Sequence, residues 1–350
     1  MSNDASPPPP PIGEAIPVSP DRLRGHVQHL AASPRNGRYA PTGHLAARQY
    51  ATDHLTAAGW TVREQPVEVQ HRVGVTDAKG PRPVWPLAYY RKLTGTNLVA
   101  ERGATAGPAL LIGAHLDSVK DSPGADDNAS GVAVLLELAT VLTEMNLAKR
   151  VILAALDLEE TGHQGAEVLA AELGDQLVGT VCLESVGYYS DDPGSQKLPR
   201  RAQSLMKESA RQLRANENRG DFAMIVHRTS STWMAQRWAQ AAAATATPLQ
   251  TMTVHDPRST GLRGRLLTTL LPVLSNLDRS DHAQFWNVGV PAIAITDTAV
   301  LRNPHYHRPT DTPDTLDYTR LAAVTTATAT LAISAGSATE RIDEAVQWHR

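Results

Sequence analysis

The centre of the chain alternates between two hydrophobic patterns. Short, continuous apolar runs occupy residues 109–115, 151–156 and 178–183, while residues 131–142 and 164–173 repeat apolar side chains at the spacing of a helix. Continuous apolar strands that alternate with helices are typical of a largely parallel sheet with both faces covered. We therefore predict an α/β fold, in which a mixed, mostly parallel sheet is flanked by helices on both faces.

The flanking segments extend this pattern in both directions. Further helices are predicted at 21–31, 42–59, 202–216, 232–243 and 318–332, and further strands at 60–70, 224–226 and 291–295. No linker-like break separates these elements, so we expect a single domain over residues 20–340. Residues 1–19 include five consecutive prolines and predict a flexible tail, and residues 341–350 are expected to form a C-terminal tail.

Composition narrows the class of protein. The 350 residues are 41% hydrophobic and carry a net charge of -3, a balance with no general attraction to nucleic acid or to anionic membranes. A single cysteine, Cys182, excludes an intrachain disulfide and a zinc site built from cysteines. No apolar stretch is long enough for a transmembrane helix, and the N-terminal residues lack the pattern of a secretory signal. A cytoplasmic location is the default expectation, with secretion left open.

Imidazole and carboxylate side chains follow each of the three central strands, and more lie in a loop near the C-terminus. They are His115, Asp117, Asp126, Asp127, Glu159, Glu160, Glu184, His305, His307 and Asp311. Open α/β sheets bind ligands at the edge where the carboxyl ends of their strands meet. Mixed nitrogen and oxygen ligands suit zinc, with cobalt or manganese as substitutes. Each residue alone has an ordinary structural explanation, such as a helix cap, but their conjunction at three strand ends favours a metal site.

Six short motifs support this interpretation. They are GAHLDS at 113–118, PGADDNASG at 123–131, EETGHQG at 159–165, LESVGY at 183–188, SDH at 280–282 and YHRPTDT at 306–312. In this order they resemble the co-catalytic di-zinc aminopeptidases of metallopeptidase family 28, whose relatives include bacterial leucyl aminopeptidases, glutamate carboxypeptidase and glutaminyl cyclases. The resemblance implies a zinc-exopeptidase-like fold and a peptide substrate.

The resemblance also implies five ligands for two divalent ions, most naturally Zn²⁺. His115 and Glu184 would bind the first ion, Glu160 and His307 the second, and Asp127 would bridge both. A charge count agrees with two ions. One divalent ion would leave net negative charge among three closely packed carboxylates, whereas two ions and a bridging hydroxide bring the cluster to zero.

Two acids have expected roles other than binding metal. The resemblance implies that the bridging hydroxide attacks the scissile carbonyl while Glu159 acts as the general base. Asp117 is expected to orient His115 through its second ring nitrogen. His305 competes with His307 as a ligand, and His307 is preferred because it keeps the spacing of the family motif.

The expected activity is that of an aminopeptidase acting on peptides. Tyr188, Tyr189, Asp281 and His282 are candidate substrate-binding residues, although core packing or structural hydrogen bonding explains them as well. His163 is expected on a turn, outside the ligand set. The alternatives are a glutaminyl cyclase-like acyltransferase that uses one zinc on the same scaffold, and a non-catalytic metal- or peptide-binding module. The sequence predicts no nucleic-acid or membrane partner and leaves the oligomeric state, the preferred residue and dipeptidase or carboxypeptidase use open.

Overall fold

The computed structural model describes residues 16–78, 87–104, 107–145, 147, 149–199, 203, 206–258 and 272–334. The predicted C-terminal tail 341–350 and residues 1–15 of the predicted N-terminal tail lie outside this description. The helices are α1 (Pro20–Leu30), α2 (Pro41–Ala57), α3 (Gly131–Thr143), α4 (Gln164–Leu173), α6 (Lys207–Ala215), α7 (Thr232–Ala243), α9 (His282–Asn287) and α10 (Tyr318–Ser334). The strands are β1 (Thr61–Val75), β2 (Leu87–Arg102), β3 (Ala109–His115), β4 (Val151–Leu156), β5 (Leu177–Glu184), β6 (Phe222–His227), β7 (Gln250–His255) and β8 (Ala292–Thr296).

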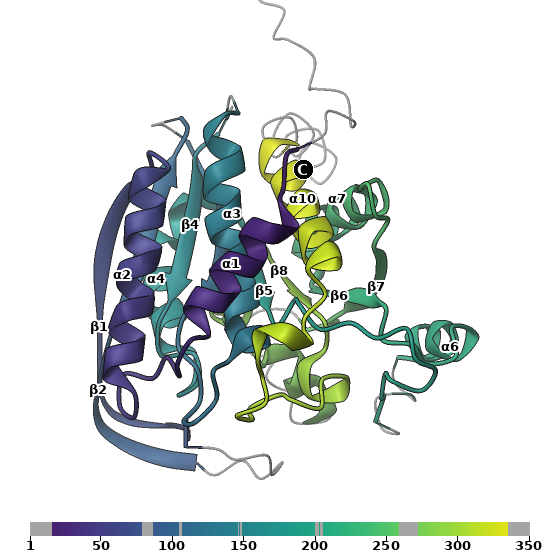
Figure 1. The fold of residues 1–350 in the computed structure, drawn as a ribbon, viewed down its shortest axis with the longest axis horizontal. Helices are drawn as coiled ribbons and strands as arrows, with labels where there is room; N and C mark the ends of the chain where they lie inside the picture. Colours follow the sequence, from purple (N-terminus) through teal and green to yellow (C-terminus); the bar gives the residue numbers. More distant parts are fainter. Residues whose placement is uncertain are drawn as a thin grey trace, which may run out of the picture.

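These strands form one sheet in the order β1-β2-β4-β3-β5-β8-β6-β7 (Figure 1). β3 pairs in parallel with β4 and with β5, and β5 pairs in parallel with β8. β2 is antiparallel to both of its neighbours, and β6 is antiparallel to β8. The predicted mixed sheet is thereby confirmed. Its parallel centre brings the carboxyl ends of β3, β4, β5 and β8 to the same edge.

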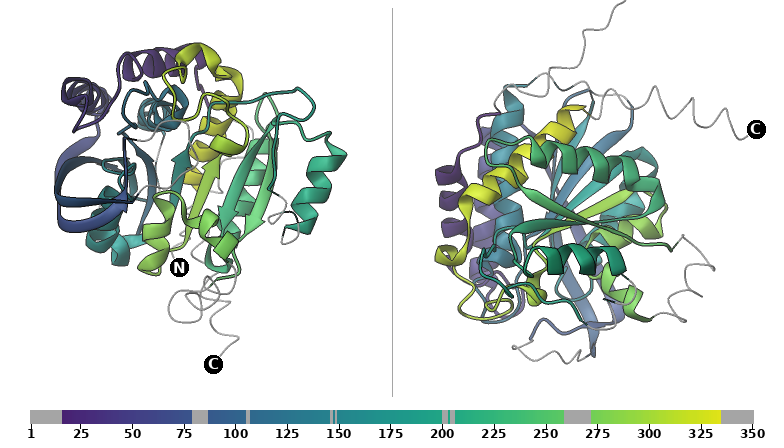
Figure 2. Two further views of the ribbon diagram at one scale, coloured as in Figure 1. Left: turned by 90° about the horizontal axis from the view of Figure 1, so that it is seen from below. Right: turned by 90° about the vertical axis from the view of Figure 1, so that its right-hand side faces the viewer.

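Helices cover both faces of the sheet, as Figure 2 shows. One apolar core joins a face of the sheet to α1, α2, α3, α7 and α10, and a second joins the other face to α4 and α9. β3 contributes to both cores, because Leu110 and Ile112 lie in the first and Leu111 in the second. A strand buried on both faces needs apolar residues at every position, which is why the central runs are continuous. No helix in the described part of the chain is long and apolar enough to cross a membrane.

Sequence analysis did not predict two strands, β2 and β7, and each has a substantial share of exposed residues. In β7, Met252 and Val254 are buried while their neighbours are more exposed, so the strand lacks a continuous apolar run. The first half of β2, which pairs with β1 but not with β4, is largely exposed. The predicted helix 202–216 is described as α6 from Lys207, with residues 202, 204 and 205 outside the description.

The described end of the predicted N-terminal tail is bound to α3. Ser19 accepts a hydrogen bond from the backbone N–H of Arg22 at 3.2 Å and so caps α1. The backbone N–H of Ser19 donates to Glu137 Oε1 at 2.7 Å, and Arg22 Nε donates to Glu137 Oε2 at 2.8 Å. Glu137 is fully buried in α3, so these contacts satisfy a carboxylate inside the core.

A buried arginine connects the first helix to the loop behind β3. Arg35 is fully buried, and its side chain donates to four backbone carbonyls: Leu30 at 3.1 Å, Leu116 at 2.8 Å, Pro123 at 2.5 Å and Gly124 at 2.9 Å. Burial lowers the pKa of Arg35 to about 10, so the guanidinium remains charged at neutral pH. This side chain therefore fixes the loop that leads from β3 to the acidic turn before α3.

We predict that Arg35→Met lowers the free energy of unfolding by about 3–5 kcal/mol, because four buried carbonyls lose a charged donor. Urea unfolding followed by circular dichroism measures the effect. Arg211→Met, on the exposed face of α6, is the matched control and should leave the midpoint unchanged. An Arg35→Met protein with the wild-type midpoint would contradict this account of the loop.

Candidate metal centre

All five predicted ligands lie at the carboxyl edge of the sheet. His115 and Glu184 are the last residues of β3 and β5. Asp127 lies in the turn Ala125–Ser130 that leads into α3, where its backbone leaves helical geometry (φ -107°, ψ 87°). Glu160 follows β4, and His307 lies in the loop between β8 and α10 with a left-handed backbone (φ 59°).

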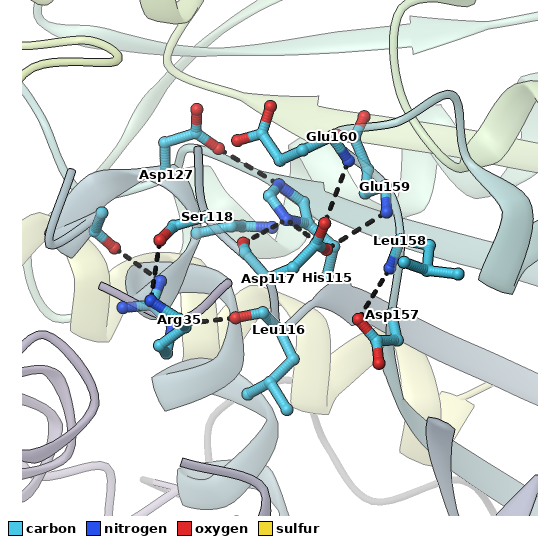
Figure 3. A network of polar contacts seen from close by, with 12 residues as sticks. Arg35, His115, Leu116, Asp117, Ser118, Asp127, Asp157, Leu158, Glu159 and Glu160 are labelled. Atoms are coloured by element: carbon cyan, nitrogen blue, oxygen red, sulfur yellow. Dashed lines mark hydrogen bonds and ion pairs between the residues drawn. The ribbon is translucent and has the colours of Figure 1, made fainter. Parts of the chain in front are cut away.

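The five side chains form two groups of three that share one residue. The ligand atoms of His115, Asp127 and Glu184 lie within 4.8 Å of one another, as do those of Asp127, Glu160 and His307. Asp127 Oδ1 is 3.1 Å from His115 Nε2, and Asp127 Oδ2 is 3.0 Å from His307 Nε2. One carboxylate thus presents a different oxygen to each group. Figure 3 shows His115, Asp127 and Glu160 converging on the same region.

Unpartnered polar atoms gather in these two groups. Among the described residues, the buried atoms without a hydrogen-bond partner include His115 Nε2, Asp127 Oδ1, Glu160 Oε1 and His307 Nε2. A buried polar atom without a partner is costly, and four such atoms in one place indicate a missing common partner. Imidazole nitrogen and carboxylate oxygen are ligands that zinc accepts, so the residues present fit a pair of divalent cations.

The electrostatics of the cluster also favour a cation. Burial raises the pKa of Glu160 to about 7, although His307 acts in the opposite direction. Burial lowers the pKa of His307, but the carboxylates of Glu160 and Asp127 outweigh it and raise that pKa to about 10. These shifts mean that protons compensate the crowded negative charge. A divalent cation that binds here would displace those protons.

Comparison with known proteins identifies the family. The family model described as "Peptidase family M28" matches residues 97–332, which is more than half of the chain. The chain belongs to peptidase family M28. The family predicted from the motifs is therefore confirmed, and with it a metallopeptidase that acts on peptides.

Two sequence relatives of this M28 chain differ in how much of it they cover. The uncharacterised protein YfbL of Escherichia coli (strain K12) is 36% identical over 248 residues, which are 67% of this chain and 69% of YfbL. An aminopeptidase of Pseudomonas aeruginosa (strain UCBPP-PA14) is 42% identical over 78 residues, which are 22% of this chain and 15% of that protein. The chain therefore matches only a short part of the relative whose name states an activity.

Solved structures of M28-like fold cover nearly the whole chain. The aminopeptidase from Aneurinibacillus sp. strain AM-1 has a TM-score of 0.63 at 16% identity, covering 91% of this chain and 94% of that one. The Porphyromonas gingivalis glutaminyl cyclase has a TM-score of 0.60 at 19% identity, covering 90% and 97%. At such low identity these likenesses establish the fold alone, and the fold is common to both activities.

In this M28 site, Asp117 holds the segment that carries the paired glutamates. Its carboxylate accepts hydrogen bonds from the backbone N–H groups of Glu159 at 3.1 Å and Glu160 at 3.2 Å (Figure 3). His115 Nδ1 lies 3.0 Å from the backbone carbonyl of Asp117 and 3.6 Å from its carboxylate. The predicted contact of the His115 ring with Asp117 is therefore shortest to the backbone carbonyl, and not to the carboxylate. The carboxylate of Asp117 instead connects the end of β3 to the segment after β4.

Three residues to which the sequence assigned no role support the site. Asp311 accepts hydrogen bonds from the backbone N–H groups of Asp126 at 2.9 Å and Asp127 at 3.2 Å. Ser280 Oγ donates to Glu184 Oε2 at 2.9 Å. Tyr306 stacks on the ring of His307, with centroids 3.9 Å apart. Each lies in one of the recognised motifs, so the motifs were the available signal, but their contacts depend on the fold.

Two alternatives raised by the sequence also have a structural outcome. His305 lies in neither group of ligands, and its Nδ1 contacts Thr310 Oγ1 at 3.0 Å. Asp126 does not cap α3 with its side chain. Its carboxylate instead accepts hydrogen bonds from the backbone N–H of Gly187 at 2.9 Å and from Asn303 Nδ2 at 2.6 Å.

A cavity of about 430 Å³ opens beside the two groups and is lined by Glu159, Glu160, His163, Tyr306 and His307, with other residues. None of the four predicted substrate-binding residues is among the described residues that line it. Tyr189 is buried against Arg302, and Tyr188 contacts the ring of His305. The carboxylate of Asp281 is buried. His282 Nε2 contacts the carbonyl of Leu277 at 2.8 Å. Their role in binding substrate stays a prediction.

We predict that Asp127→Asn weakens metal binding more than Glu184→Gln does, because Asp127 belongs to both groups and Glu184 to one. The loss of affinity should be at least about tenfold, since even residues that only orient ligands have effects of that order. Metal content after dialysis, measured by mass spectrometry, tests this, with exposed Asp53→Asn as the matched control. Equal metal retention in the Asp127 and Glu184 variants would contradict a shared ligand.

Proposed function

We propose that this M28 chain is an aminopeptidase, which removes N-terminal residues from peptides with two divalent cations, preferably Zn²⁺, and with Glu159 as the general base. The position of Glu159 carries the proposal. It is a buried carboxylate that lines the cavity together with Glu160 and His307, yet it belongs to neither group of ligands. An acid beside the ligands, and not among them, is available to exchange a proton with a substrate.

The ligand assignment follows the two groups of side chains. His115 and Glu184 would hold one cation, Glu160 and His307 the other, and Asp127 would contact both. Bound cations would supply Lewis acidity, which polarises a carbonyl and lowers the pKa of water toward neutrality.

Glu159 is ionised at neutral pH and is therefore able to accept a proton. Burial raises its pKa, but the nearby rings of His163 and His115 lower it more, so the net pKa lies below the usual value. The ionised carboxylate would take a proton from water as the water oxygen bonds to the scissile carbonyl carbon. As the carbon–nitrogen bond breaks, Glu159 would pass that proton to the leaving amine nitrogen.

A cavity-lining hydroxyl adds a second polar group. Burial, together with the carboxylates of Asp127 and Glu160, raises the pKa of Tyr306 well above its usual value. The hydroxyl therefore stays protonated and can donate a hydrogen bond to a substrate oxygen.

The alternative of a glutaminyl cyclase has support in the fold, because a glutaminyl cyclase is among the similar structures. Cyclisation with one zinc would use only one group of ligands, whereas here both groups are complete and share Asp127. A short match to an aminopeptidase of Bacillus subtilis (strain 168), 44% identical over 57 residues, also favours hydrolysis. A non-catalytic binding module would not explain why the cavity contains the buried carboxylate of Glu159, which belongs to neither group of ligands.

We predict that Glu159→Gln lowers kcat by about 100- to 10,000-fold, because the amide cannot accept the proton. Bound metal should stay at the wild-type amount, since Glu159 lies outside both groups. Hydrolysis of aminoacyl p-nitroanilides and metal analysis on the same samples measure both quantities, with exposed Glu144→Gln as control. Loss of metal in proportion to activity would make Glu159 a ligand and remove it as the base.

A panel of substrates separates the activities. We expect cleavage of peptides with a free N-terminal amine, little cleavage of their N-acetylated forms, and loss of activity with a chelator that divalent zinc restores. Peptides that begin with glutamine distinguish the alternative, because a cyclase releases ammonia and leaves the peptide chain intact. Release of ammonia without peptide cleavage would refute the aminopeptidase proposal.

A further inference from the structure

The turn after β4 directs one histidine at the proposed general base. His163 Nε2 lies 3.0 Å from Glu159 Oε1, and the two side chains are 19% and 9% exposed. The backbone N–H groups of Gly162 and His163 both donate to the carbonyl of Glu159, at 2.8 and 2.9 Å. The turn therefore contacts Glu159 twice, with the His163 ring at its carboxylate and with backbone N–H groups at its carbonyl.

Helix capping does not explain the ring of His163. The residue occupies the N-cap of α4, but its side chain makes no capping hydrogen bond. Its backbone is left-handed, with φ 64°, a conformation that histidine adopts less readily than glycine. Among the described residues, His163 is the one basic side chain that forms an ion pair with Glu159. It also lines the cavity beside Glu159.

The positions of the protons decide that His163 donates the hydrogen bond and that Glu159 accepts it. An ionised carboxylate only accepts hydrogen bonds, so the nitrogen that faces it must carry a proton. Nε2–H is present both in the imidazolium and in one neutral tautomer, so the contact does not require His163 to be charged. When Glu159 takes a proton on Oε2, Oε1 can still accept the hydrogen bond from the ring. The hydrogen bond can therefore persist before and after the proton transfer.

We propose that His163 is a positioning residue, which holds Oε1 of Glu159 and thereby leaves Oε2 in place to carry the proton. The proposal rests on the proposed function of Glu159. A glutamate side chain has several rotatable bonds, and a fixed oxygen limits the carboxylate to one orientation. A misplacement of about 1 Å of a reacting group is enough to cost about 100-fold in rate.

The experiment removes the donor and then restores one. His163→Leu should lower kcat by about 10- to 100-fold, with KM within about twofold and bound metal unchanged, because only the orientation of the base is lost. His163→Gln presents an amide N–H at a similar distance along the side chain and should recover most of that loss. His255→Leu, at the exposed end of β7, is the matched control and should have wild-type kcat.

A double-mutant cycle tests whether His163 acts through Glu159. Added to Glu159→Gln, His163→Leu should cause no further loss beyond about twofold, because the group that it positions no longer accepts a proton. The same fold-loss in both backgrounds would overturn the proposal, as would a fully active His163→Leu protein or one that has lost its metal. If His163→Leu does not fold, His163→Asn replaces it. The shorter amide should be less active than His163→Gln, and equal activity would overturn the proposal.

The same variants distinguish this proposal from the proposed function. If Glu159→Gln retains wild-type activity, then Glu159 is not the base and the proposed mechanism fails. If Glu159→Gln is inactive but His163→Leu is fully active, then the base assignment stands and only the positioning role of His163 is wrong.

Discussion

Like charges crowded into a small volume are the constraint on which the site depends. Asp127, Glu160 and Glu184 bring three carboxylates together with two imidazoles at one sheet edge, largely shielded from water. Such a cluster repels itself unless positive charge compensates it. Burial and the neighbouring Asp127 carboxylate raise the pKa of Glu160, and the attraction of Glu160 and Asp127 raises the pKa of His307 in spite of its burial. The surrounding acids, Asp117 and Asp311, bind backbone N–H groups, so they position the ligands without competing for a cation.

Two adjacent glutamates acquire different chemistry from their neighbours. Asp117 fixes the backbone N–H groups of both Glu159 and Glu160. From these fixed backbone positions the two side chains diverge. Glu160 Oε2 lies 3.4 Å from His307 Nε2, whereas Glu159 Oε1 lies 3.0 Å from His163 Nε2. Burial, with the Asp127 carboxylate, raises the pKa of Glu160 although His307 opposes it. Burial also acts to raise the pKa of Glu159, but the rings of His163 and His115 outweigh it and lower that pKa. Two side chains of the same type can thus have different roles because their surroundings differ.

Much of the centre of the molecule could be predicted from the sequence, and its periphery could not. The runs 109–115 and 151–156 coincide with β3 and β4 because a strand buried on both faces leaves an unmistakable apolar run. The half-exposed strand β7 leaves none. The ligands could be placed together because parallel strands share an edge, whereas the contact between His163 and Glu159 depends on the left-handed turn between β4 and α4. The contacts of Arg35 could not be predicted either, since three of its four carbonyl partners lie 81 to 89 residues away in the sequence.

The residues that match the family model are fewer than the residues that support the site. The match to the family begins at residue 97, yet Arg35 lies beneath the loop that leads to Asp127, and Glu137 of α3 is satisfied by Ser19 and Arg22. The apolar residues of α1 and α2 belong to the same core as the central strands. The segment that matches the family model therefore shares its core and its polar contacts with residues before position 97. A protein trimmed to the matched residues would lack Arg35, and the loop before Asp127 would lose the side chain that donates to its carbonyls.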